Sequence, residues 1–223
     1  MSLILNIDTA VVGASLCLAD GEEILALKEN PDQKDSAAWL QPAIKTIFQE
    51  QNRKLSDIAA VAVSTGPGSY TGLRVGMATA KGLCYALNVP LITISTLKMM
   101  AAAALPRDTL LCPMIDARRM EVFTGVYNKD LQEVVSPTNL IVEKESFSNL
   151  LKSKQISFFG KGSDKFRELC EDENALFETI VASAKDLVNL SNQAYAESYF
   201  ADLAYAEPLY LKEFYTIRSK EKS

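Results

Sequence analysis

The residues best suited to chemistry by type and spacing lie between Ser64 and Gly82, in the stretch STGPGSYTGLRVGMATAKG. A glycine-rich loop that opens a helix often cradles a phosphate, because its backbone N–H groups point at the anion. The stretch does not fit the pattern G-x-x-x-x-G-K-[ST], since no Lys-Ser or Lys-Thr follows its glycines. It also departs from the dinucleotide pattern G-x-G-x-x-G, because Thr71 takes the third glycine position and Gly72 comes one residue late. Neither motif supports a nucleotide site.

A structural interpretation explains more of the same residues. Gly66-Pro67-Gly68 predicts a sharp turn from a strand into a helix. Small residues then recur at every fourth position of that helix and share one face, which permits closer approach than the usual separation of roughly 8–10 Å between helix axes. The face packs either inside its own lobe or against another molecule, and both alternatives stay open. Its residues are Gly72, Gly76, Ala80 and Cys84, flanked by Leu73, Met77 and Leu83.

The chain of 223 residues contains no histidine. This excludes a Ser-His-Asp triad, a Cys-His dyad, an H-E-x-x-H zinc site and an imidazole general base. The cysteines, Cys17, Cys84, Cys112 and Cys170, form no C-x-x-C pair and lie in apolar or helical runs, which predicts buried free thiols. A formal net charge of -5 argues against autonomous nucleic-acid binding, which depends on clustered Lys and Arg. No apolar run is long enough to predict a transmembrane helix.

The elements that would position these residues are alternating strands and helices. An antiparallel meander opens the chain, with Asp20-Gly21 as a hairpin signal. The apolar runs 58–63 and 91–94 are typical of strands buried on both faces. Pro42 lies within the first helix, where proline costs about 3 kcal/mol, so this helix is expected to begin late or to kink. Further helices are predicted at 70–87, 95–104, 163–170 and 184–204, and further strands at 110–116, 120–127 and 156–159.

The segment Leu105-Pro106-Arg107-Asp108 interrupts this pattern and predicts a boundary between two lobes, residues 1–104 and 105–223. The last segment is expected to pack back on the first lobe. Each half shows strands with hairpin turns, followed by helix, strand and helix. The repetition predicts an α/β protein with the two-lobed actin-like ATPase (ASKHA, ribonuclease H-like) fold, in which each lobe is a mixed β-sheet flanked by helices.

Four stretches together resemble the TsaB family, also called YeaZ, whose bacterial members are required for threonylcarbamoyladenosine (t6A) modification of tRNA. The glycine-rich stretch resembles the family signature, and residues 6–10 with 14–16 resemble its first hairpin. Residues 114–123 resemble the motif D-A-R-R-x-E-V-[FY]. Residues 206–211 resemble the C-terminal ending A-x-P-x-Y-[LV]-R, with Lys212 in place of the arginine. Together the matches extend from residue 4 to residue 212.

The resemblance implies the non-catalytic paralogue of the threonylcarbamoyltransferase TsaD rather than an enzyme. TsaD carries an H-x-x-x-H metal site in the helix where this chain has Asp35 and Trp39, so no metal or other cofactor is expected. The family commonly has His-Ser where Asp35-Ser36 stands here, and the effect of that replacement is open. An older glycoprotease label for the family finds no supporting chemistry in a chain without histidine.

TsaB-like proteins act as scaffolds that bind TsaD side by side through the small-residue helix and its neighbour. The resemblance therefore implies a partner interface at Gly72, Leu73, Gly76, Met77, Ala80, Leu83 and Cys84. It also implies the ATPase TsaE as a second partner near the junction, and a homodimer through the same surface when the chain is alone. Contact with tRNA is expected only through the complex, with no membrane contact and a cytoplasmic location.

Four charged residues have two interpretations, either as ordinary surface charges or as contacts to TsaE or tRNA. Exposed ion pairs usually contribute less than about 1 kcal/mol. The paired donors of Arg, however, suit recognition of carboxylate or phosphate, which favours an interface role. These residues are Arg74, Asp116, Arg118 and Arg119.

Asp8 ends the first predicted strand, where nucleotide-binding members of the actin-like superfamily have an Asp that positions magnesium and phosphates. Here Thr9 follows and no glycine allows close phosphate approach, which favours a vestigial nucleotide site at Asp8 and Thr9. The main alternative function is a small ATPase or sugar-kinase-like enzyme of the same superfamily, which would bind ATP with magnesium. A peptidase is a third alternative, disfavoured by the missing histidine.

Overall fold

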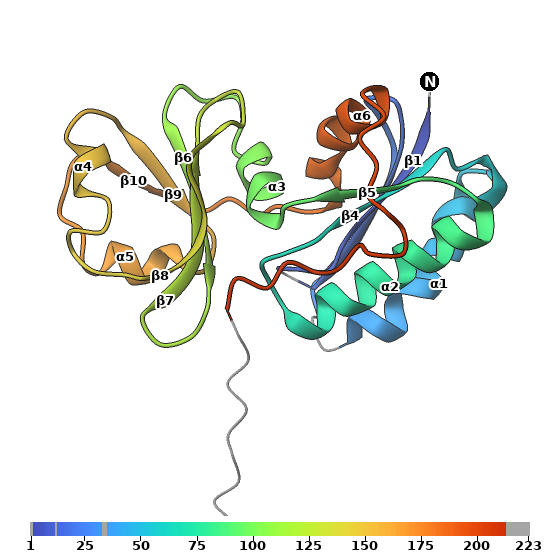
Figure 1. The fold of residues 1–223 in the computed structure, drawn as a ribbon, viewed down its shortest axis with the longest axis horizontal. Coiled ribbons are helices and arrows are strands. Elements are labelled where there is room, and N and C mark those ends of the chain that lie inside the picture. Colours follow the sequence, from blue (N-terminus) through green and yellow to red (C-terminus); the bar gives the residue numbers. More distant parts are fainter. Residues whose placement is uncertain (1, 12, 33–34, 213–223) are drawn as a thin grey trace, which may run out of the picture.

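The computed structural model describes residues 2–11, 13–32 and 35–212. Two lobes lie side by side, each built around one five-stranded sheet (Figure 1). The strand order is β3-β2-β1-β4-β5 in the first sheet and β10-β9-β6-β7-β8 in the second. Both sheets mix parallel and antiparallel neighbours, which confirms the predicted fold class.

The bounds of the elements follow the chain. The strands are β1 Leu3–Asp8, β2 Ala14–Asp20, β3 Glu23–Asn30, β4 Ala60–Ser64, β5 Leu91–Ile94, β6 Leu110–Asp116, β7 Glu121–Tyr127, β8 Glu133–Ile141, β9 Ile156–Phe159 and β10 Ala175–Glu178. The helices are α1 Ser36–Glu50, η2 Leu55–Asp57, α2 Tyr70–Leu87, α3 Thr96–Ala102, α4 Ser148–Leu151, α5 Ser163–Arg167, η3 Ala184–Leu187 and α6 Val188–Ala196.

The first sheet opens with the predicted antiparallel meander, and β4 and β5 then run parallel to β1. Strands β1 and β4 are buried along their whole length, as their continuous apolar sequences predict. Successive side chains of β1 serve opposite faces of the sheet. Leu5 and Ile7 pack with α1 and α2, whereas Ile4 packs with α3 on the other face.

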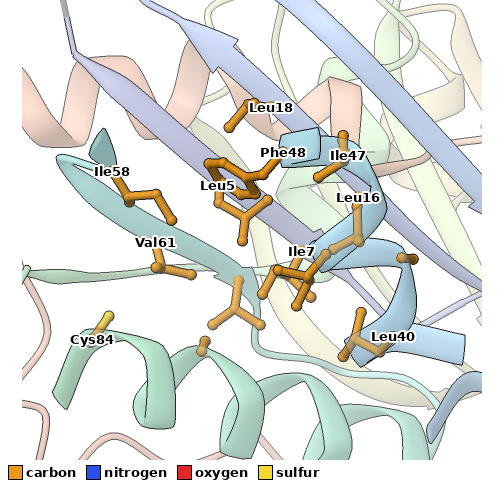
Figure 2. Packing of buried hydrophobic residues seen from close by; sticks show 14 of the residues in the cluster. Leu5, Ile7, Leu16, Leu18, Leu40, Ile47, Phe48, Ile58, Val61 and Cys84 are labelled. Atoms are coloured by element: carbon orange, nitrogen blue, oxygen red, sulfur yellow. The ribbon is translucent and has the colours of Figure 1, made fainter. Parts of the chain in front are cut away.

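Helices α1 and α2 cover one face of the first sheet (Figure 1). Figure 2 shows Leu40, Ile47 and Phe48 of α1 directed at the side chains of β1 and β2. Pro42 lies inside α1, but the helix begins at Ser36, so the expected late start is wrong. Pro42 lies on the solvent-exposed side of α1, and the buried face of the helix remains continuous.

The second lobe has its own aromatic core. Phe158 of β9 lies between 4.9 and 5.4 Å, measured between ring centroids, from Phe147, Phe166 and Phe177. The two lobes also share a cluster, in which Leu97 of α3 packs with residues of both sheets. The sheets are therefore joined by buried apolar contacts as well as by the chain itself.

The last part of the chain returns to the first lobe. Helix α6 ends at Ala196 rather than near residue 204, so the second half of the predicted helix is wrong. The cause is local, because Ser198 adopts a left-handed φ of 53°, a conformation that terminates helices. Elements η3 and α6 belong to the predicted second lobe, 105–223, and they bury Ala184 and Val188 against β2 of the first lobe.

After α6 the chain runs beside α2 toward the second lobe (Figure 1). We call residues 201–212 the C-terminal strap. Ala201 forms a bridge with Leu91 of β5, and the Leu209 N–H donates to the Thr65 carbonyl at 2.7 Å. At its end, Lys212 forms an ion pair of 2.6 Å with Glu121 of the second lobe. The strap therefore connects both lobes.

Candidate functional site

The glycine-rich loop between β4 and α2 packs against the protein's own backbone. A Cβ at Gly66, whose φ is 119°, would lie 2.6 Å from the Leu209 carbonyl oxygen. A Cβ at Gly68 would collide with the Ala10 carbonyl oxygen. That oxygen instead accepts a hydrogen bond of 2.7 Å from the Ser69 N–H. These glycines make room for neighbouring chain segments, not for a phosphate.

The small-residue face of α2 is turned toward the sheet of its own lobe. A Cβ at Gly72 would meet the Thr9 carbonyl oxygen, and one at Gly76 would meet the Thr9 hydroxyl. The Thr9 hydroxyl donates to the Gly72 carbonyl at 2.7 Å. Cys84 points at the same sheet in Figure 2, and burial raises the pKa of its thiol to about 11.

The structure places most residues of the predicted partner interface inside the first lobe. Six of its members are buried inside the first lobe and have no surface to offer a partner: Gly72, Leu73, Gly76, Met77, Ala80 and Cys84. The seventh, Leu83, is partly buried and packs on the same cluster. The same small residues are expected on a helix face that packs closely against a sheet and on one that packs closely against another molecule. In this structure the small-residue face of α2 packs against the sheet of its own lobe.

The opposite face of α2 is open. Gly82 has no atom within 4 Å of the position a Cβ would take, and Tyr85 is 83% exposed. Gln41 of α1 donates to the Thr79 hydroxyl at 3.2 Å, which links the two helices at this surface. We call this surface the α1–α2 face, and its exposed residues on α2 are Thr71, Arg74, Ala78, Gly82, Tyr85 and Ala86.

Asp8 ends β1 and Thr9 follows it, and neither is among the residues that line the cleft between the lobes. Asp8 is buried, and its Oδ1 accepts hydrogen bonds from the Ser64 hydroxyl at 2.5 Å and the Ala10 N–H at 3.0 Å. Burial raises the pKa of this carboxyl, although both hydrogen bonds oppose the shift. Both residues tie β1 to β4 and α2, and this internal bonding explains why they are polar and buried.

A cleft of about 890 Å³ lies between the two lobes. Its first-lobe wall is formed by Ala10, Val11 and residues 68–71 at the start of α2. Its second-lobe wall includes residues 114–118 at the β6–β7 hairpin, Gly160 and Lys161 after β9, and residues 178–182. The cleft therefore lies where the turn between β1 and β2 of the first lobe faces the β6–β7 hairpin of the second lobe.

Three of the charged residues singled out in the sequence share the β6–β7 hairpin. Asp116 accepts hydrogen bonds from the Lys165 ammonium at 2.7 Å and the Arg118 N–H at 2.6 Å. Burial raises the pKa of Asp116, but these two hydrogen bonds and the positive charge of Lys165 together leave the pKa below its usual value. Arg118 lines the cleft, whereas Arg119 is exposed outside it and interacts electrostatically with Glu121.

Arg74 lies apart from that hairpin, on the α1–α2 face. Its guanidinium lies 4.0 Å from the centre of the Tyr70 ring, and its Nε donates to the Tyr210 hydroxyl at 3.2 Å. On the same helix, Lys81 donates to the carbonyl oxygens of Ala204 and Ala206 at 3.2 and 3.0 Å. Lys81 and Tyr210 both lie in the matched motifs, but the sequence does not predict their contacts, because nothing local to either residue indicates a partner more than a hundred positions away.

Within the described ranges, no group of His, Cys, Asp and Glu is arranged to hold a metal ion. The same part of the chain has no helix that is both long and apolar enough to cross a membrane. All four cysteines are free, as predicted, and three of them are buried.

The two mixed sheets and the cleft between them define a two-lobed α/β protein of the actin-like ATPase and sugar kinase fold. The solved activator of 2-hydroxyisocaproyl-CoA dehydratase from Clostridium difficile, with bound ADPNP, matches with a TM-score of 0.52. The match covers 88% of this chain and 97% of that chain at 9% sequence identity, so it shows the fold alone.

More similar proteins place the chain within one family. The family model described as "TsaD: tRNA N6-adenosine threonylcarbamoyltransferase" matches residues 30–213. The tRNA threonylcarbamoyladenosine biosynthesis protein TsaB of Bacillus subtilis is 30% identical over 174 residues, 76% of this chain and 75% of the relative. A Pseudomonas aeruginosa structure, described as an uncharacterized protein similar to the peptidase YEAZ, has a TM-score of 0.84 and 25% identity, covering 95% of this chain and 100% of that one. The chain belongs to the TsaB family, a family of tRNA t6A biosynthesis, as its motifs predict.

Proposed function

We propose that the protein is a non-catalytic subunit of the machinery that makes t6A in tRNA, and that it binds and activates the threonylcarbamoyltransferase TsaD. The observation that carries the proposal is Gly82 on the α1–α2 face. A glycine in a helix interior costs about 1 kcal/mol relative to alanine. Nothing within the lobe requires one here, since a Cβ at Gly82 would meet no atom within 4 Å. Close approach by a helix of another molecule would explain it.

The surroundings of Gly82 support the same surface. Tyr85 offers a large exposed ring one turn from the glycine, and aromatic anchors beside small residues are typical of the centres of protein interfaces. The hydrogen bond between Gln41 and Thr79 makes the surface one continuous unit of two helices. A rigid two-helix surface loses little conformational entropy when a partner binds.

In this proposal, TsaD occupies the α1–α2 face in the working complex, and a second copy of this chain occupies it when TsaD is absent. TsaE binds near the junction, tRNA is reached only through the complex, and the protein works in the cytoplasm without a cofactor. Arg74 lies on that face, and the hairpin with Asp116, Arg118 and Arg119 lies at the cleft. We propose these residues as contacts to TsaE or tRNA.

The ATPase alternative has less support. A catalytic or metal-binding Asp at the end of β1 would need an accessible carboxylate, and Asp8 is buried and hydrogen-bonded to Ser64. The backbone of residues 9 and 10 also fills the space beside Gly68 and Gly72 that a phosphate would use. The chain's lack of histidine continues to disfavour a peptidase.

The test is size-exclusion chromatography with light scattering, for the protein alone and mixed with its cognate TsaD. The wild type and Gly82→Ala are expected to form the mixed complex, whereas Gly82→Leu, which is too bulky for close helix approach, is expected to lose it. Glu168→Leu adds the same side chain at an exposed position of the second lobe and serves as the control. Normal assembly of folded Gly82→Leu would place the interface elsewhere.

A further inference from the structure

Two segments of the second lobe meet at the edge of the cleft. Gly160 has a φ of 88°, and a Cβ there would lie 2.5 Å from the Met114 carbonyl oxygen. The Gly162 N–H donates to the same oxygen at 3.0 Å. The loop after β9 therefore lies directly on the backbone at the end of β6. This contact brings Lys161, between the two glycines, and Arg118, on the hairpin, to one side of the cleft.

The charged residues around the cleft are only partly paired with one another. Each carboxylate that lines the cleft already forms an ion pair: Asp116 with Lys165, Asp164 with Arg167 and Glu178 with Arg107. Arg118 and Lys161 line the same cleft, and neither forms an ion pair with any residue that the structure describes. The cleft lining carries three carboxylates and three cations, and Arg118 and Lys161 are the two lining cations outside its ion pairs.

The backbone that carries Arg118 is unusual. Arg118 and Arg119 both adopt left-handed conformations, with φ of 69° and 50°. Left-handed backbone favours Gly, Asn or Asp, and larger side chains are disfavoured there. The turn is held by the Arg118 N–H bond to Asp116 and by the Glu121 N–H bond to the Arg118 carbonyl at 3.1 Å. The left-handed backbone itself therefore does not require an arginine at position 118.

We propose that the interlobe cleft binds a small organic anion, whose phosphate or carboxylate group is held by Arg118 and Lys161. Arg offers paired donors to such a group and Lys adds a compact charge. The volume of about 890 Å³ is that of a cleft for a small molecule. Met100, Ile115 and Phe123 line the same cleft and would cover a less polar body. The carboxylates that line the cleft are each in an ion pair, so in this proposal the cations hold the anion directly and not through a metal.

The inference does not depend on the proposed TsaD surface, because the cleft and the open glycine of the α1–α2 face are separate surfaces. It gives Arg118 a small-molecule ligand in place of the TsaE or tRNA contact proposed above. A metal-free test uses phenyl phosphate as the probe, with benzoate and phenol as matched compounds that carry a carboxylate or no charge. Binding is followed by amide NMR shifts of the isotope-labelled protein in EDTA. Saturable shifts are expected at residues 116–118 and 160–164 with phenyl phosphate, benzoate or both, and their relative affinity identifies the anionic group.

The variants Arg118→Gln and Lys161→Gln are each expected to weaken binding of the better probe by about tenfold, the effect of removing one charged hydrogen bond. Arg119→Gln removes the same charge from the neighbouring turn position, outside the cleft, and is expected to leave binding unchanged. The proposal is overturned if no shift saturates with the probes at roughly ten millimolar. It is equally overturned if phenol binds as well as the anions, or if Arg119→Gln weakens binding as much as the cleft variants.

Discussion

At the scale of single residues, the glycines of α2 have two different causes although one helix carries them all. Gly72 and Gly76 lie against Thr9, where any Cβ would collide with the chain. Gly82 lies on the opposite face in open space. The sequence predicts that these positions need small residues but not which face meets the sheet. The orientation of α2 depends on how it packs against β1, and the spacing of residues along α2 carries no information about that packing.

Substituting the two kinds of glycine should give opposite results. Gly72→Ala is expected to lower the free energy of unfolding by about 1–3 kcal/mol, because the new Cβ must displace the Thr9 backbone. Gly82→Ala is expected to raise it by about 1 kcal/mol, because it removes the helix penalty of glycine without a new contact. Urea denaturation of both variants measures the two changes. A stabilised Gly72→Ala would contradict the packing described for α2.

Asp8 should make stability depend on pH in a defined direction. Burial raises its folded pKa above the usual value of 3.8, so between those two pKa values the folded state binds more protons than the unfolded state. Its contribution to the free energy of unfolding therefore falls as pH rises above about 4. In Asp8→Asn the amide oxygen still accepts from Ser64 and no such fall is expected. Urea denaturation at several pH values measures the free energy of unfolding of Asp8→Asn and of the wild type. The difference between these two free energies should grow toward neutral pH, and a difference that does not change with pH would contradict this.

At the scale of elements, the strands and helices with clear apolar patterns and clear ends are the ones that the sequence predicts. α2, β5, β6 and β9 have the predicted bounds, because each apolar run stops at a turn signal. Strand β8 was missed because it is an exposed edge strand that contains Pro137, and so has no buried alternating face. The predicted helix 184–204 is too long for another reason, because the residues after Ala196 include good helix formers but Ser198 adopts a left-handed conformation.

The C-terminal strap is held to α2 by tertiary contacts, so its order should depend on them. Lys81→Met removes the ammonium that donates to the Ala204 and Ala206 carbonyls while keeping a long apolar stem. Hydrogen exchange of the Leu209 amide, which bonds to Thr65, is expected to become about tenfold faster, in line with loss of charged hydrogen bonds at a partly exposed site. Lys45→Met, on exposed α1, is the matched control. Equal protection in Lys81→Met would mean that other contacts hold the strap.

At the scale of the whole molecule, the two lobes are physically one unit even though their sheets are separate. α3 lies in a buried cluster with Ile92 of the first sheet and with Leu111 and Phe159 of the second. The strap adds a polar connection through Lys212 and Glu121. The sequence predicts two sheets from its repeated pattern, but the shared cluster depends on contacts between distant segments. Unfolding of one lobe should therefore destabilise the other.

The single tryptophan makes this coupling measurable. Trp39 lies in α1 and packs on the first-lobe cluster, so its fluorescence reports on that lobe. Phe158→Ala empties the aromatic core of the second lobe and is expected to reduce stability by about 3–5 kcal/mol. If the lobes unfold together, Phe158→Ala lowers the urea midpoint seen by Trp39 fluorescence as much as the midpoint seen by circular dichroism. Phe158→Leu, which removes less volume, lowers both midpoints by less. A Trp39 transition that stays at the wild-type midpoint would mean that the lobes unfold independently and that the shared cluster contributes little free energy.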